Sequence, residues 1–309
     1  MFVFHDVTAQ KVSWVKSNRD ALEANKAAIS NLYYPESIEE FIELIRELTT
    51  NEDSFELIGH SSNTLFLPSY HINNLICTKN ISSWSESETE IICECGVSVG
   101  KLSRAMIKKG YMGFEGLTDL PGTVAGAVYG NSGCRHCSVN DLVIDIELLT
   151  NEGIKHIGIE TLKLSYRSTA LKRKEITGTI LRVRLKKIKG DPDKLTEIAK
   201  YNHLYRKSNQ PSGANNLGTT FNGGRCPTLK GWILYLIERC IQLITFDRDS
   251  RHSYSILLKI IGKGYFIPYI YRWNRYMFLD EKSHVLFPQY IKFIQSIYKD
   301  VRLEIEIRK

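Results

Sequence analysis

The chain has 309 residues, of which 43% are hydrophobic and 24% charged, which is ordinary for a folded protein with a sizeable core. Its formal net charge is +7, yet the sequence contains no run of five consecutive basic residues and no zinc-finger or RNA-binding motif. We therefore expect no nucleic-acid partner, while the modest positive charge suits a phosphorylated ligand.

Signals for secretion or membrane insertion are not found in the sequence. The first twenty residues lack an apolar run between a basic start and a small-residue cleavage site. The most apolar stretch, residues 232–246, is interrupted by charged and polar residues and is too short to span a bilayer, so a buried or peripheral amphipathic helix is expected there. The seven cysteines are odd in number and scattered, as in reduced cytosolic proteins. We expect a cytoplasmic protein without a membrane span.

The first helix is predicted from its cap and its apolar spacing. Apolar residues recur at helical spacing from Ile38 to Ile45, which gives one face to bury. Ser37 is expected to cap this helix, and Glu40 is expected to close a capping box.

Further elements alternate along the chain. Gly110 is the expected C-cap of a helix at 99–109, and Pro192 suits the first turn of a helix at 191–206. This order indicates a mixed chain of helices and strands with a boundary between residues 186 and 212. The remaining expected elements are strands at 55–58, 64–67, 91–97, 143–149, 179–185 and 303–307, and a last helix at 290–297.

Two glycine-rich turns carry the first functional signal. In the first, residues 57–65, a strand enters a Gly-Ser-Asn turn whose outward N–H groups suit a pyrophosphate, although a simple hairpin turn would look the same. In the second, residues 120–133, four glycines leave the backbone bare, so that a flat ring or a diphosphate can approach it. Neither turn is the Rossmann fingerprint, because no G-x-G-x-x-G opens a helix after the first strand.

Together, about sixty residues apart, the two turns resemble the FAD-binding domain of the UDP-N-acetylenolpyruvoylglucosamine reductase family. That family reads roughly G-x-G-S-N-x-L in the first turn and G-I-P-G-T-V-G-G-A-x-x-x-N-A-G in the second. The resemblance implies an α+β protein with two FAD-binding subdomains of the vanillyl-alcohol oxidase/p-cresol methylhydroxylase type, at 1–70 and 71–190. A C-terminal α/β substrate lobe would occupy 191–309.

The resemblance also implies FAD as cofactor, with its pyrophosphate against the two turns, NADPH as co-substrate and a sugar nucleotide as substrate. No metal is expected. The residues it assigns to cofactor binding are Gly59, His60, Ser61, Ser62, Asn63, Thr64, Pro121, Gly122, Thr123, Gly126, Ala127, Asn131, Gly133 and Ile180.

Three positions look like the family's catalytic residues. Arg167, in the run Ser165–Ser168, matches the arginine of Y-R-x-S that faces the enolpyruvyl carboxylate. Thr219 stands at the serine of G-S-x-F, which is the proton donor, and Glu306 at the glutamate of L-x-x-E, the other acid. The residues implied on the substrate side are Tyr166, Arg206 and Asn222.

The chemistry accounts for these residue types. Reduction of an enolpyruvyl ether places negative charge next to a carboxylate, which a fixed cation and an acid stabilise, and a hydroxyl must then protonate the carbon. Each residue also has an ordinary explanation. Arg167 could end an exposed strand, Thr219 could be a turn threonine, and Glu306 could lie on a solvated strand face.

The sequence departs from the family in the C-terminal lobe. Residues 222–224 read Asn-Gly-Gly where the family has K-N-P, and 229–280 lacks the family's glycine-rich core. An aromatic and basic stretch at 265–276 stands there instead. It is either core packing with a basic rim or a remodelled acceptor pocket, with aromatics stacking a base or sugar and arginines on a phosphate.

Two cysteine pairs allow simple interpretations. Cys134 and Cys137 have C-x-x-C spacing without a second pair, so a flavin thioether is a functional alternative and a metal site is not favoured. Cys93 and Cys95 are expected to be small buried hydrophobes on one strand face.

Three functions remain open at this stage. The first is an NADPH-dependent reductase of an enolpyruvyl sugar nucleotide, either for peptidoglycan or for another surface glycan. The second is a flavin oxidoreductase of the same fold acting on another substrate, such as a sugar alcohol or lactone. The third is a flavin-binding protein with vestigial catalysis. Thr219 and Glu306 favour catalysis, whereas the altered region 229–280 argues against the standard substrate.

Overall fold

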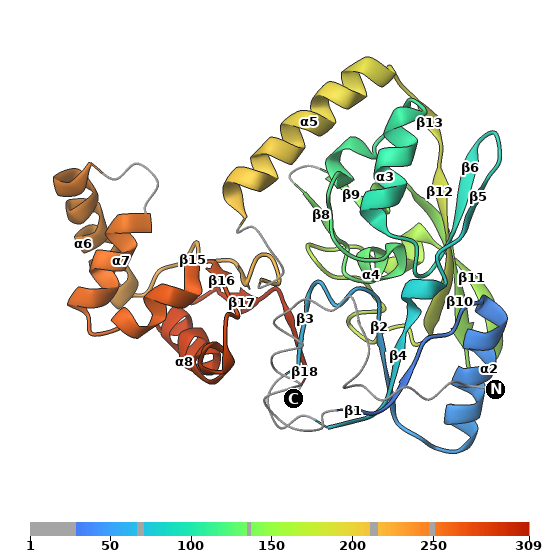
Figure 1. Ribbon diagram of the computed structural model, residues 1–309, viewed down its shortest axis with the longest axis horizontal. Coiled ribbons are helices and arrows are strands. Elements are labelled where there is room, and N and C mark those ends of the chain that lie inside the picture. The colour runs from blue at the N-terminus through green and yellow to red at the C-terminus, as the bar shows by residue number, and fades with distance from the viewer. Residues whose placement is uncertain (1–28, 67–70, 135–136, 211–215, 247–250, 309) are drawn as a thin grey trace. The chain divides into compact units, whose positions relative to one another are not determined.

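The computed structural model describes residues 29–308 except 67–70, 135–136, 211–215 and 247–250 (Figure 1). The chain divides into two compact units. The described part of the first unit is Ile29–His60 with Ile72–Ser208, and the second unit combines Ser61–His71 with Asn209–Lys309. The segment just after Gly59 and His60 therefore belongs to the unit formed by the C-terminal third of the chain.

The first unit begins with a three-stranded parallel sheet in the order β1-β4-β2. Helix α2 (Ile38–Thr50) starts as expected, because the Ser37 hydroxyl accepts from the Glu40 N–H at 3.1 Å. The Glu40 carboxylate reaches back one residue beyond the cap, to the N–H of Glu36 at 2.7 Å. The strands are β1 (Ile29–Tyr33), β2 (Phe55–Ile58) and β4 (Ile72–Cys77).

A five-stranded antiparallel sheet in the order β11-β10-β12-β6-β5 forms the rest of this unit. Helices α3 (Val99–Lys108) and α4 (Val124–Tyr129) bury their apolar faces in a core shared with β6, β10 and β12 (Figure 1). The strands are β5 (Trp84–Glu86), β6 (Glu90–Glu94), β10 (Val143–Thr150), β11 (Gly153–Gly158) and β12 (Thr179–Lys186).

Short elements complete the first unit. Two small antiparallel pairs join β7 to β13 and β8 to β9. Single 3₁₀ turns lie at Thr78–Asn80, Glu115–Leu117, Val139–Asp141 and Ile159–Leu162. The strands of the two pairs are β7 (Tyr111–Met112), β13 (Ile188–Lys189), β8 (Gly133–Cys134) and β9 (Cys137–Ser138).

Helix α5 (Pro192–Asn209) lies almost entirely in the first unit, whereas we expected a separate lobe to begin at residue 191. Its side chains explain this placement. Asn202 donates to the Glu115 carbonyl at 3.0 Å, and the His203 ring lies 2.6 Å from the Asp119 carboxylate. These contacts fix α5 to the segment just before the second glycine-rich turn.

The second unit has an aromatic core formed by helices and short strands. Phe266, Tyr276, Phe287 and Tyr290 are all fully buried and pack ring against ring. The first of the two explanations for the stretch 265–276, core packing, therefore holds for Phe266 and Tyr276. The helices are α6 (Leu229–Thr245), α7 (Arg251–Ile260) and α8 (Glu281–Ile297), with a 3₁₀ segment at Gly264–Tyr269.

The strands of this unit pair over long sequence distances. The expected single strand at 303–307 is split in two, because β17 (Arg302–Leu303) pairs with β14 (Phe221–Asn222) and β18 (Glu306–Arg308) with β3 (Thr64–Phe66). Strands β15 (Ile270–Arg272) and β16 (Arg275–Tyr276) form a hairpin. Among the described helices, α6 included, none has the length and apolar character needed to cross a membrane.

Candidate functional site

The start of the first glycine-rich turn, up to His60, packs against the second turn within the first unit. Strand β2 ends at Ile58 and leads into Gly59, and the second turn enters α4 through Thr123, whose hydroxyl caps Gly126 at 3.2 Å. A Cβ built on Gly59 would lie 2.4 Å from the Thr123 Oγ1 atom. Only glycine therefore allows the backbone of the first turn to approach the second so closely.

The start of helix α3 is bonded to the second turn. Val99 N donates to the Gly122 carbonyl at 3.1 Å, and Val124 N donates to the Val97 carbonyl at 2.8 Å. Gly122 has a φ of +120°, a conformation that favours glycine. This bonding brings the first turn of α3, with Lys101, to the glycine-rich turns.

Positive charge surrounds the first turn. Burial lowers the pKa of His60 below its ordinary value of 6.5, and the nearby cations Lys101 and Lys79 lower it further. The Lys79 ammonium also lies 4.6 Å from the centroid of the Tyr34 ring. An anionic group bound here would meet two cations, which is the electrostatic environment that a diphosphate needs.

Unsatisfied buried hydroxyls provide a direct test of the fit to a polar ligand. The Ser61 hydroxyl, in the first turn, is buried and has no hydrogen-bond partner among the residues that the structure describes. The Tyr34 hydroxyl, in the first unit, is likewise buried and has no hydrogen-bond partner among the described residues. Because buried polar groups are nearly always paired, the Tyr34 hydroxyl, on the residue that lies beside Lys79, fits a ligand with acceptor oxygens such as FAD.

Some of the other second-turn residues expected to bind the cofactor make contacts within the protein. The Asn131 amide donates to the Ser165 carbonyl at 2.7 Å and accepts from Asn140 at 3.0 Å. A Cβ on Gly133 would lie 2.0 Å from the Cys137 carbonyl oxygen, so the β8–β9 hairpin requires this glycine. Ala127 is buried in the core, and Gly126 and Pro121 are exposed at the turn. The assignment of these residues to cofactor contact stays a prediction.

Ile180, the cofactor residue expected outside the two turns, lies in β12 opposite Leu148. It is buried in the core of the five-stranded sheet. Its side chain thus has a packing role, and only its backbone remains to serve a ligand.

Arg167 is held against the second turn. Its guanidinium donates to the carbonyls of Asn131 at 3.2 Å and Gly133 at 2.7 Å, and its backbone adopts a φ of +54°. The guanidinium also lies 5.2 Å from the Tyr166 ring centroid, and that ring is 65% exposed. The turn and the Tyr-Arg loop thus form one hydrogen-bonded group in the first unit.

Glu306 lies beside the end of the first turn, within the second unit. Its N–H donates to the Asn63 carbonyl at 2.8 Å, and Asn63 Nδ2 donates to the Glu304 carbonyl at 3.2 Å. The Glu306 carboxylate is 3.7 Å from the guanidinium of Arg308. The structure therefore brings together two residues that are more than 240 positions apart in the sequence.

Thr219 precedes a tightly bonded strand of the second unit. Thr220 is buried, its hydroxyl accepts from the Tyr276 N–H at 3.0 Å, and its carbonyl accepts from the Glu304 N–H at 3.0 Å. Thr219 itself is only half-buried. Its hydroxyl is thus the more accessible of the two, and Glu304 links its strand to the segment that carries Glu306.

The expected substrate-side residues differ in their surroundings. Arg206, in α5, is 8% exposed, and two of its guanidinium nitrogens are buried without a partner among the described residues. Asn222 is half-buried in β14, opposite Arg302.

The glycines after Asn222 have a structural cause. A Cβ on Gly223 would lie 2.3 Å from the Asp300 carbonyl oxygen, and one on Gly224 would lie 2.7 Å from the Trp273 ring. This chain therefore packs backbone against Asp300 and Trp273 at the positions where the family has asparagine and proline.

The cysteines are consistent with a structural role. Cys93 and Cys95 are buried as expected, and burial raises the pKa of both thiols to about 12. Cys137 Sγ donates to the Gly113 carbonyl at 3.3 Å, whereas the Cys134 side chain and residues 135–136 lie outside the described residues. Within the described part of the chain, no group of three or more potential ligands gathers to hold a metal.

Sequence reasoning did not find Tyr34, Lys79 and Lys101. They lie in three separate segments, and none belongs to a recognisable motif. The sequence offers one weak signal for Tyr34, namely its position just before Pro35, where strand β1 gives way to helix α2.

Comparison with known proteins gives the same fold. Residues 29–158 match a family model described as an FAD binding domain. The chain is 28% identical over 191 residues to UDP-N-acetylenolpyruvoylglucosamine reductase of Thermosipho melanesiensis, covering 62% of this chain and 64% of that one. The enzyme of the same name from Fusobacterium nucleatum subsp. nucleatum is 30% identical over 186 residues, covering 59% and 63%. The chain thus matches less than two thirds of the length of these relatives.

A solved structure extends the likeness in fold to the whole chain. UDP-N-acetylenolpyruvylglucosamine reductase from Thermus caldophilus superposes with a TM-score of 0.68 at 18% identity, covering 100% of both chains. The protein has an α+β flavoprotein fold with an FAD-binding domain. Over 191 residues its sequence is similar to UDP-N-acetylenolpyruvoylglucosamine reductase.

Proposed function

We propose that this protein is an FAD-dependent oxidoreductase that uses NADPH to reduce an enolpyruvyl sugar nucleotide. The observation that carries the proposal is the packing of Gly59 against Thr123, inside the region that matches an FAD-binding domain. That contact holds the two turns against each other. The lysines at 79 and 101 supply positive charge at the first of them.

Bound FAD would supply a two-electron carrier, which no protein side chain provides. The residues proposed to hold it are Gly59 and Thr123 in the turns, with Lys79 and Lys101 as counter-charges, all within the first unit. The bare backbone of the turns would admit the diphosphate. Binding in this way orients the cofactor and excludes water from its diphosphate.

The proposed catalytic residues act on the acceptor. Arg167 presents a fixed cation that stabilises a carboxylate while negative charge develops next to it. Glu306 serves as an acid in the same reaction, and the Thr219 hydroxyl gives its proton to the acceptor carbon. These roles follow from the family positions of the three residues, and the accessible hydroxyl of Thr219 supports its assignment.

A second candidate is a flavin oxidoreductase of the same fold that acts on a different acceptor. Asn222, Gly223 and Gly224 stand where the family has K-N-P, so the lysine and asparagine of the family's substrate face have no counterpart, and a Cβ on either glycine would overlap Asp300 or Trp273. An acceptor other than the family's sugar nucleotide would not need that lysine and asparagine.

Anaerobic stopped-flow absorbance separates the candidates. NADPH should bleach the flavin, and UDP-N-acetylglucosamine enolpyruvate should then restore its colour. Bleaching without recovery of colour would favour the second candidate. A flavin that neither NADPH nor NADH bleaches would contradict the reductase and favour an oxidase or a flavin-binding protein with vestigial catalysis.

A further inference from the structure

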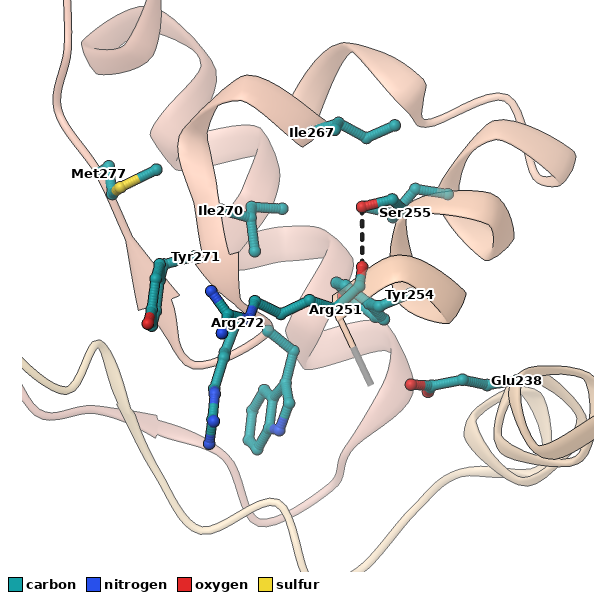
Figure 2. Close-up of a pocket in the computed structure, with 11 residues that line it drawn as sticks. Glu238, Arg251, Tyr254, Ser255, Ile267, Ile270, Tyr271, Arg272 and Met277 are labelled. Carbon is teal, nitrogen blue, oxygen red and sulfur yellow. Dashed lines mark hydrogen bonds between the residues drawn. The ribbon is translucent and has the colours of Figure 1, made fainter. Parts of the chain in front are cut away.

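The second unit contains a pocket of about 450 Å³ between α7, the end of the 3₁₀ segment and the β15–β16 hairpin (Figure 2). That volume lies in the range of small-molecule sites. The lining residues in the described part of the chain all come from the second unit, and none of them belongs to the proposed flavin or catalytic groups. The lining residues are Glu238, Arg251, Tyr254, Ser255, Leu258, Ile267, Ile270, Tyr271, Arg272, Trp273 and Met277.

Two arginines give the pocket a positive balance. Arg251, from α7, places its guanidinium 4.6 Å from the Tyr271 ring centroid, which holds the side chain toward the hairpin (Figure 2). Arg272 donates through Nη1 to Asn209 at 3.2 Å, but its buried Nε has no partner among the residues that the structure describes. Glu238 is the single carboxylate among the lining residues that the structure describes.

The arginines face a rigid aromatic and aliphatic wall. The Trp273 ring stacks on Phe221 with 8° between the ring planes, and its backbone carbonyl accepts from the Tyr290 hydroxyl at 2.5 Å. Ile267, Ile270 and Met277 line the same pocket with apolar side chains (Figure 2). Burial raises the pKa of Tyr254, so its hydroxyl stays protonated and can donate.

We propose that this pocket binds a small organic anion, with its phosphate or carboxylate at Arg251 and Arg272 and a flat ring beside Trp273. Guanidinium groups match the geometry of both oxyanions, and the buried Nε of Arg272 gains the partner that it lacks in the described chain. The ring replaces water against Trp273 and the aliphatic side chains. This site goes beyond the proposed redox function, because it requires neither the flavin nor the catalytic residues.

Calorimetric titration of the FAD-saturated protein tests the site. Adenosine monophosphate represents the phosphate arm and indole-3-acetate the carboxylate arm, while adenosine and inorganic phosphate each lack one half of the ligand. We expect at least one ring-bearing anion to bind, about tenfold or more tightly than either half-ligand. The arm that binds identifies the oxyanion. Binding of neither anion, or equal binding of adenosine, would overturn the proposal.

Substitutions locate the binding. Arg251→Gln and Arg272→Gln should each weaken it about tenfold or more, because each loses a charge-assisted hydrogen bond. Lys259→Gln is the matched control, since it removes the same charge from an exposed position of α7 outside the pocket and should leave affinity unchanged. Circular dichroism and thermal unfolding verify that each variant is folded. Wild-type affinity in both arginine variants, or equal weakening by Lys259→Gln, would place the ligand elsewhere.

Discussion

The contact between Gly59 and Thr123 leaves no room for a side chain in the first turn. Gly59→Ala should lower bound FAD and destabilise the protein by about 1–3 kcal/mol, because the new methyl group overlaps the Thr123 side chain. Released FAD, measured by chromatography after denaturation, gives the stoichiometry, and urea unfolding gives the free energy.

A double-mutant cycle assigns that effect to the contact. Thr123→Ala alone removes the cap of α4 and should cost about 1 kcal/mol, and its FAD content is the reference for the double variant. Because it also removes the two atoms nearest to the new methyl group, the double variant should recover part of the FAD lost by Gly59→Ala. Normal FAD content in Gly59→Ala would contradict the close packing of the two turns.

His60 makes stability depend on pH in a defined direction. Its pKa in the folded protein is lowered below 6.5, so the unfolded chain binds the extra proton first as the pH falls. The stabilisation by His60 is therefore complete above pH 6.5 and is lost as the pH drops through the folded pKa. Urea unfolding of the FAD-free protein between about pH 7.5 and about pH 5.5 should show a steeper decline than in His60→Gln.

Bound FAD supplies a control for that titration. A diphosphate near His60, Lys79 and Lys101 would offset the charge of the two lysines and raise the pKa of His60. The difference in pH dependence between wild type and His60→Gln should then shrink when FAD is present. Equal pH dependence of the two FAD-free proteins would show that His60 does not titrate in this way.

Thr219 is tested as the proton donor by separating two half-reactions. Thr219→Ala should leave bleaching of the flavin by NADPH nearly intact and slow the acceptor-dependent return of colour by about 10²–10⁴-fold. Thr219→Ser keeps the hydroxyl and should be mild. The neighbouring Thr220→Ser is the suitable control, because the buried Thr220 hydroxyl accepts from Tyr276 N and an alanine would lose that bond. Return of colour at the wild-type rate in Thr219→Ala would exclude the role.

At the level of elements, the β15–β16 hairpin is tied to the strand that follows Thr219. The Asn274 side chain accepts from Phe221 N at 2.5 Å and donates to the Phe221 carbonyl at 2.8 Å, while its carbonyl accepts from Thr220 N at 3.1 Å. Phe221 is 1% exposed, so water cannot replace these bonds. The hairpin therefore fixes the backbone next to the proposed proton donor.

Asn274→Ala should destabilise the protein by about 1–3 kcal/mol for each Phe221 backbone group left unpaired. Thermal unfolding measures this, and Asn73→Ala, at an exposed position of β4, is the matched control with an effect near zero. If Asn274→Ala melts like the control, the hairpin is not held by this side chain.

The sequence predicted elements best where local signals were complete. The strand expected at 55–58 formed at those residues, and the helix expected at 99–109 formed at Val99–Lys108, because Gly110, with a φ of +78°, marks its end. Strands β1 and β4 were not predicted, because their parallel pairing with each other defines them and no local residue pattern marks it. The strand expected at 303–307 was divided because its two halves pair with segments far apart in sequence.

Over the whole molecule, the motifs located the turns but not their surroundings. Gly59 and Thr123 could be predicted from sequence because the glycine-rich runs are long and ordered. Lys79, Lys101 and Tyr34 could not, since their charge and burial at the first turn depend on how β1, β4 and α3 pack. The pocket beside Trp273 likewise depends on tertiary packing of a divergent segment.

The most direct test of the account is the cofactor content of the purified protein. We predict a yellow protein that carries FAD, or takes up added FAD, at about one equivalent and releases it on denaturation. The FAD should be identified by chromatography and mass spectrometry of the supernatant, and Gly59→Ala purified in parallel should carry markedly less. A colourless wild-type protein that takes up no added FAD would contradict the central claim that the two packed turns form a flavin site.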